Sequence, residues 1–99
     1  MQSLQLYNNE TDHTTSQSHV YVNNNKVYQI TDSYRDLASK EQMDRVLENL
    51  IIEKGFVLDS QREHTIKLTN PTDSETVYWL WTDTLGINKR TNRMVGELD

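Results

Sequence analysis

The clearest pattern in the chain is a stripe of apolar residues with helical spacing. Met43 is followed at positions i+3, i+4, i+7 and i+8 by apolar residues, which are Val46, Leu47, Leu50 and Ile51. Ser39 is placed to cap the start of this helix, Gln42 completes a capping-box pattern, and Gly55 stands where a C-terminal cap is expected. The pattern therefore predicts one main amphipathic helix over residues 40–54.

Alternating apolar and polar residues before and after this helix predict β-strands. The expected strands are residues 18–31 as a hairpin, 56–58, 64–69, 76–82, and 86–98 as a second hairpin. Asn23 to Asn25 would form the first turn, because Asn tolerates a positive φ angle, and the polar residues 59–63 and 70–74 are expected as further turns. The second hairpin would carry Lys89 to Arg93 at its tip. Together these elements indicate an α+β fold, in which a small, mostly antiparallel sheet of about five to six strands has helix 40–54 packed on one face.

The N-terminal residues carry weaker signals. Residues 8–18 are polar throughout, so a flexible loop is expected there within a single domain that spans residues 1–99. Leu4 and Leu6 alternate with polar residues, which suits a short edge strand before that loop. Ser33 and Asp36 repeat the capping pattern, and the sequence leaves open whether the helix extends back to Ser33.

The segment 76–82 is apolar on both of its faces. Val77, Trp79 and Trp81 alternate with Tyr78 and Leu80, so the strand is either central in the sheet or faces a partner. A single helix can cover only one face of the sheet. The second face is then covered either by the N-terminal hairpin, through its apolar residues Val20, Val22, Tyr28 and Ile30, or by another molecule.

Composition and charge narrow the function classes. The formal net charge is −5, from 10 Lys and Arg against 15 Asp and Glu, and the chain has no Cys. The lack of Cys excludes disulfides, thiolate metal sites and a Cys nucleophile, and it favours a cytoplasmic location.

No segment approaches the roughly 20 apolar residues of a membrane-spanning helix, and residues 1–9 lack the features of a signal peptide, so no membrane association is expected. The Asn-rich, compact chain suits a gene of a bacterial virus or mobile element.

Candidate catalytic and metal-binding residues are few and poorly placed. Glu10, Asp12, His13 and His19 carry ligand atoms for a metal ion, but they lie in or beside the polar segment, where no rigid second shell would hold them. His64 could act as a general base, although a lone His at the start of a strand is more often plain surface. The chain has only 3 Gly and no phosphate-binding loop or hydrolase motif, so no catalytic residue, metal ion or small-molecule cofactor is expected.

These patterns favour a non-enzymatic protein-binding module, a small inhibitor or accessory factor whose partner is another protein or a second copy of the chain. The expected contact residues are Tyr78, Trp79, Trp81, Arg90 and Arg93.

An alternative is a nucleic-acid-binding regulator, in which Lys89, Arg90 and Arg93 hold phosphates beside these aromatic residues, although the acidic net charge opposes it. A second alternative is a small endoribonuclease-like toxin that would use Tyr78, His64, Arg90 and Arg93.

Overall fold

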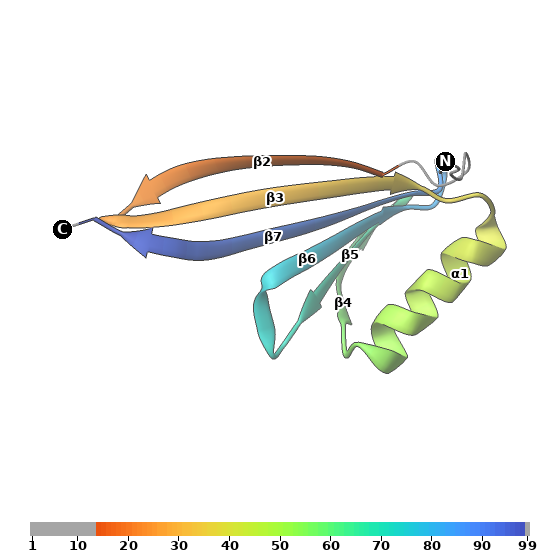
Figure 1. The fold of residues 1–99 in the computed structure, drawn as a ribbon. Helices are drawn as coiled ribbons and strands as arrows, with labels where there is room; N and C mark the ends of the chain where they lie inside the picture. Colours follow the sequence, from red (N-terminus) through yellow and green to blue (C-terminus); the bar gives the residue numbers. More distant parts are fainter. Residues whose placement is uncertain (1–13, 99) are drawn as a thin grey trace, which may run out of the picture.

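A computed structural model of the protein describes residues 14–98. It contains a six-stranded antiparallel sheet with one helix packed on one face, which confirms the predicted α+β fold (Figure 1). The elements are β2 (Thr14–Asn23), β3 (Lys26–Asp36), α1 (Lys40–Glu48), which continues directly into the π-helical turn η1 (Asn49–Glu53), β4 (Val57–Arg62), β5 (Thr65–Asn70), β6 (Asp73–Trp81) and β7 (Gly86–Glu97). No helix in this part of the chain is long and apolar enough to cross a bilayer.

The strand order in the sheet is β2-β3-β7-β6-β5-β4, so the last strand lies between β3 and β6. The predicted hairpin over residues 86–98 is therefore wrong, because Gly86–Glu97 forms one continuous strand. Residues 89–93 pair with β3 on one side and with β6 on the other, so two neighbours satisfy the backbone hydrogen bonds that a turn would leave unpaired. Strand β6 is internal in the sheet, which is one of the two positions that its apolar faces allowed.

Strands β2 and β3 form the predicted N-terminal hairpin, and both strands are longer than expected. Asn24 and Asn25 have φ angles of 54° and 63°, as in a type I′ turn. The flexible loop expected over residues 8–18 is wrong for residues 14–18, which belong to β2, while residues 8–13 and the strand expected around Leu4 lie outside the described residues. Hydroxyl pairs stabilise this polar stretch, since Ser18 Oγ lies 2.9 Å from Thr31 Oγ1 on β3.

The helix begins where the sequence places its cap. Ser39 Oγ accepts a hydrogen bond from the Gln42 backbone N–H at 3.2 Å, and Gln42 Oε1 accepts one from the Ala38 N–H at 2.7 Å. Helix extension back to Ser33 does not occur, because β3 continues to Asp36. The helix buries Met43 and Leu50 of its apolar stripe and packs Val46 and Leu47 against the core, whereas Ile51 is 46% exposed. The core comprises Leu37, Met43, Leu50, Phe56, Leu68, Leu80 and Ile87.

The strands after the helix are longer than the sequence pattern indicated. The turn expected over residues 59–63 is wrong over its first four residues, because β4 continues to Arg62 and reverses at Glu63 and His64, where Glu63 has a φ angle of 51°. The next turn is confined to Pro71 and Thr72. The side chains of β4 are exposed along its whole length, which is why their pattern gave little indication of a strand.

The two faces of the sheet are covered unequally. Helix α1 lies on one face, beside β4, β5 and β6, while β2, β3 and β7 extend together away from it (Figure 1). The N-terminal hairpin continues the sheet edge to edge through the pairing of β3 with β7, so the interpretation in which it covers the second face is wrong. No element among residues 14–98 lies on the face opposite α1 (Figure 1).

Candidate functional site

The open face, the sheet face opposite α1, carries a group of aromatic residues. Side chains of directly opposed residues in an antiparallel pair point to the same face, and the register aligns Trp79 with Asn88, and Asn88 with Tyr34. Trp81 shares this face, and the ring centroids of Tyr34 and Trp81 lie 5.9 Å apart. A shallow cleft of about 400 Å³ on this face is lined by Thr15, Gln17, Asp32, Tyr34, Trp79, Trp81, Asn88 and Arg90.

The position of the Tyr34 ring depends on a glycine in the neighbouring strand. Gly86 begins β7, and a Cβ atom built on it would meet the Tyr34 hydroxyl and lie 2.9 Å from Cζ of the ring. The ring therefore lies across the backbone of Gly86, where any larger residue would displace it. Burial raises the pKa of the Tyr34 phenol, and the carboxylate of Asp36 raises it further.

Two cations flank the ring of Trp79, and each is paired with a carboxylate. The Arg90 guanidinium lies 5.7 Å from the ring centroid, and the Lys67 ammonium lies 5.8 Å from it. Arg90 donates two hydrogen bonds to Asp32, at 2.8 and 3.0 Å, and Lys67 lies 3.6 Å from a carboxylate oxygen of Asp59. The hydrogen bond from Arg90 lowers the pKa of Asp32, so this carboxylate stays charged at neutral pH. The centre of the open face is consequently aromatic and balanced in charge.

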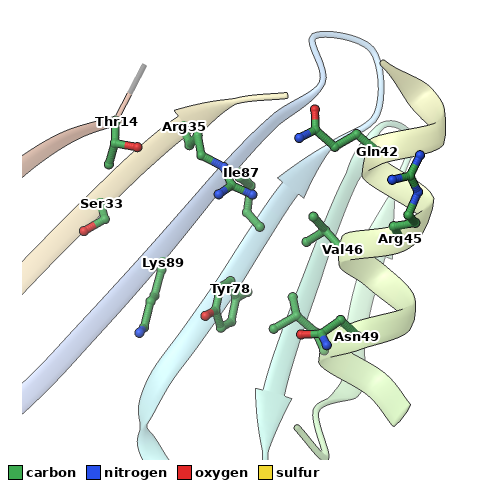
Figure 2. A pocket seen from close by; sticks show the side chains of 11 residues that line it. Thr14, Ser33, Arg35, Gln42, Arg45, Val46, Asn49, Tyr78, Ile87 and Lys89 are labelled. Carbon is green, nitrogen blue, oxygen red and sulfur yellow. The ribbon is translucent and has the colours of Figure 1, made fainter. Parts of the chain in front are cut away.

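The helix side of the sheet holds a second concave region, which we call the cationic groove (Figure 2). It has a volume of about 400 Å³ and is lined by Thr14, Ser33, Arg35, Gln42, Arg45, Val46, Asn49, Leu50, Tyr78, Ile87 and Lys89. Arg35 and Lys89 come from the sheet and Arg45 from α1, and no Asp or Glu is among the lining residues. Arg45 also makes an exposed ion pair with Glu41 at 3.6 Å. Burial raises the pKa of Tyr78, whose ring lines this groove.

The residues expected to form one contact surface are divided between these two faces. Trp79, Trp81 and Arg90 lie on the open face, as the cleft lining shows. Tyr78 lies on the opposite face, where its ring meets Phe56 edge to face at 5.0 Å. Arg93 is opposite Gln29 in a register that places it on the helix side with Lys89, so the predicted basic tip at residues 89–93 does not exist as one cluster.

Tyr34 and Asp32 are part of the open face, although the sequence reasoning did not select them. Tyr34 directly follows Ser33, the alternative start of the helix, and Asp32 directly follows the predicted hairpin over residues 18–31. The alternation of Tyr28, Ile30, Asp32 and Tyr34 was the available signal, because period-two spacing assigns all four residues to one face of a strand. The pairing of Asp32 with Arg90 depends on the register of β3 against β7, which no local pattern specifies.

The candidate catalytic and metal-binding residues do not assemble in residues 14–98. No three His, Cys, Asp or Glu side chains of this part of the chain lie close enough together to hold a metal ion. His19 lies within β2, while Glu10, Asp12 and His13 fall outside the described residues. The residues of the endoribonuclease alternative are separated, because Tyr78 and Arg90 are on opposite faces of the sheet and His64 is in the exposed β4–β5 turn.

Comparisons with known proteins returned no relative. No protein-family model matches the chain, and neither the curated proteins nor the solved structures include a match. The open face and the cationic groove are therefore the two surfaces whose geometry points to a function.

Proposed function

We propose that the protein is a non-enzymatic protein-binding module that acts in the cytoplasm as a small inhibitor or accessory factor, with the open face as its contact surface. The observation that carries this proposal is the group formed by Tyr34, Trp79 and Trp81 on a face that no described element covers. Trp, Tyr and Arg are the residues that most often dominate the binding energy of protein interfaces. The hydrogen-bonded strands beneath them hold these side chains in place, which reduces the entropy lost on binding.

The charge balance of the open face favours a protein partner over nucleic acid there. Stacking of bases on Trp79 would require free cations beside it to hold the phosphates. Arg90 and Lys67 are instead each paired with an Asp, so the two cations beside Trp79 add no net positive charge around its ring. A protein surface requires no such excess, and ion pairs at the rim of an aromatic centre are common in protein interfaces.

The proposal is tested by affinity capture from extracts of the natural host, followed by measurement of binding to the purified partner. We expect Trp79→Ala to weaken binding at least about 30-fold, the effect of losing a central aromatic contact worth about 2 kcal/mol. Ile52→Ala is the matched control, because Ile52 is 69% exposed and lies in η1, away from the open face. Circular dichroism of each variant verifies the fold. Equal capture of the partner by the wild type and by Trp79→Ala would reject the open face as the contact surface.

A second candidate function is favoured by the cationic groove, namely the binding of single-stranded nucleic acid on the helix side. Arg35, Lys89 and Arg93 all point to this face, and the residues that share it on β2, β3 and β7 include no Asp or Glu in the described part of the chain. Ser and Thr hydroxyls, which can donate hydrogen bonds to phosphates, occupy many of the remaining positions. The strip that β2, β3 and β7 form on the helix side therefore carries positive charge, although the formal net charge of the chain is −5.

The nucleic-acid function has a distinct test, which uses fluorescence anisotropy of a labelled single-stranded oligonucleotide. Charge reversal in Lys89→Glu and Arg93→Glu should abolish binding, and the affinity of the wild type should fall steeply with added salt. Lys54→Glu is the control, since Lys54 lies at the far end of the helix. An affinity that is insensitive to salt, or one that Lys54→Glu reduces equally, would exclude the cationic groove as a nucleic-acid site.

A further inference from the structure

The two edges of the sheet differ in how they are protected from pairing with another strand. Exposed edges usually carry charged residues, prolines or bulges that prevent such pairing. Edge strand β4 has two of these features, because its pairing with β5 shifts between Leu58 and Ser60 and it contains Asp59 and Arg62. Edge strand β2 has none, since its ten residues pair with β3 without a shift and include no Pro, Asp, Glu, Lys or Arg.

Alternate residues of β2 direct their backbone hydrogen-bonding groups away from β3. In a hairpin with a two-residue type I′ turn, the residues that flank the turn exchange hydrogen bonds, and here these are Asn23 and Lys26. The pattern then alternates along the strand, so the outward-directed set is Thr14, Ser16, Ser18, Val20 and Val22. All five residues are exposed, and no described strand pairs with this edge.

We propose that two copies of this chain associate through β2, antiparallel, about a twofold axis at Ser18. Such pairing joins the two six-stranded sheets into one continuous sheet. Ser18 is the centre of the outward-directed set, so this register forms the largest number of new backbone hydrogen bonds. It also places Ser16 opposite Val20 and Thr14 opposite Val22 of the second copy, and keeps equivalent faces of both sheets on the same side.

Charge and shape favour a second copy as the occupant of this edge. Two acidic chains, each with a formal net charge of −5, repel one another over most contacts, whereas β2 brings no formal charge from Asp, Glu, Lys or Arg into the interface. The small Ser and Thr side chains allow close approach of the two edges. Val20 and Val22 are 59% and 55% exposed, and each would be partly covered by a neighbour from the other copy. The pairing does not depend on the proposed function of the open face.

The register is tested directly by Ser18→Cys, because the chain has no Cys of its own. Directly opposed residues of a hydrogen-bonded antiparallel pair have Cα atoms about 5.5 Å apart, within the range that a disulfide spans. We expect this variant to form a covalent dimer under mild oxidation at least about tenfold faster than Ser60→Cys, which is also at an exposed position but on the protected edge β4. Equal rates for the two variants would overturn the proposal.

Sedimentation equilibrium provides the second measurement on the full chain. The wild type should dimerise reversibly, and Ser18→Lys should raise the dimer dissociation constant at least about tenfold, since it places two ammonium groups opposite one another. Ser60→Lys should leave that constant unchanged. A wild type that stays monomeric at every accessible concentration, a dimer that tolerates Ser18→Lys, or crosslinking of Ser18→Cys to a different protein alone would each refute pairing with a second copy.

Discussion

Replacement of Gly86 by Ala tests whether the open face is organised by the close contact between Tyr34 and β7. An added Cβ atom would meet the Tyr34 hydroxyl and would lie 2.9 Å from Cζ and 3.1 Å from Cε1 of the ring. Contacts this close require the ring to move, and Tyr34 is in turn packed against Trp81 at a centroid distance of 5.9 Å. The substitution should therefore displace Tyr34 and disturb its packing on Trp81.

The expected magnitude follows from two opposing effects. Overpacking of a well-packed site costs about 1–3 kcal/mol, whereas replacing Gly with Ala recovers about 0.4–1 kcal/mol by restricting the unfolded chain. The net destabilisation should lie between about 0 and 2.6 kcal/mol, with a central value of about 1.3 kcal/mol. Gly96→Ala is the control in the same strand, because a Cβ atom at Gly96 meets nothing within 4 Å, and it should be neutral or stabilising by up to about 1 kcal/mol.

Urea unfolding, followed by tryptophan fluorescence and far-UV circular dichroism, measures these free energies. The same substitution is also made in a Tyr34→Ala background, where the ring is absent and Gly86→Ala should cost nothing. The reasoning is refuted if Gly86→Ala destabilises the protein no more than Gly96→Ala does. It is equally refuted if the cost of Gly86→Ala is unchanged when Tyr34 is removed.

Three further predictions concern the helix cap, the core and the ion pair of the open face. Ser39→Ala should lower the free energy of unfolding by about 1 kcal/mol in urea, because the Gln42 N–H loses its acceptor, and an unchanged midpoint would contradict the cap. Leu80→Ala should cost about 2–5 kcal/mol in the same assay, since Leu80 is 0% exposed, and a loss below about 1 kcal/mol would contradict its place in the core. Arg90 holds the pKa of Asp32 below its usual range. The ion pair therefore stabilises the fold fully at pH values above about 3.9, the pKa of the carboxyl group in the unfolded chain. This stabilisation is lost as the pH falls through the lower pKa of Asp32 in the folded protein. Asp32→Asn should consequently be less stable than the wild type by about 0.2–1 kcal/mol at pH 7, and this difference should shrink as the pH falls below about 3.9. A difference that stays constant as the pH is lowered would assign the effect to something other than charge.

The helix, the hairpin turn and strand β6 could be predicted because their signals are local. The stripe that begins at Met43 repeats every three to four residues, and Asn24 and Asn25 adopt the positive φ angles that the turn requires. Trp79 and Trp81 were assigned to one face because they are two residues apart in a strand. Each of these inferences uses residues that are close together in the sequence.

The long polar strands could not be predicted, because pairing with distant segments determines them. Residues 14–18 and 89–93 have no apolar alternation, and their strand conformation depends on pairing with β3 and, for residues 89–93, also with β6. The ion pair on the open face could not be predicted either, because it also depends on pairing between distant segments. Asp32 and Arg90 are 58 residues apart and meet only through the register of β3 against β7.

The position of β7 between β3 and β6 has a consequence for synthesis of the protein on the ribosome. The chain emerges from its N-terminus, so the β2–β3 hairpin and the β4–β5–β6 meander are translated before the strand that joins them. Until Gly86–Glu97 leaves the exit tunnel, β3 and β6 each present an unpaired edge, and the nascent chain consists of two partial sheets. A chain that stopped before Gly86 would therefore keep two exposed strand edges, on β3 and on β6, which are targets for chaperones and proteases.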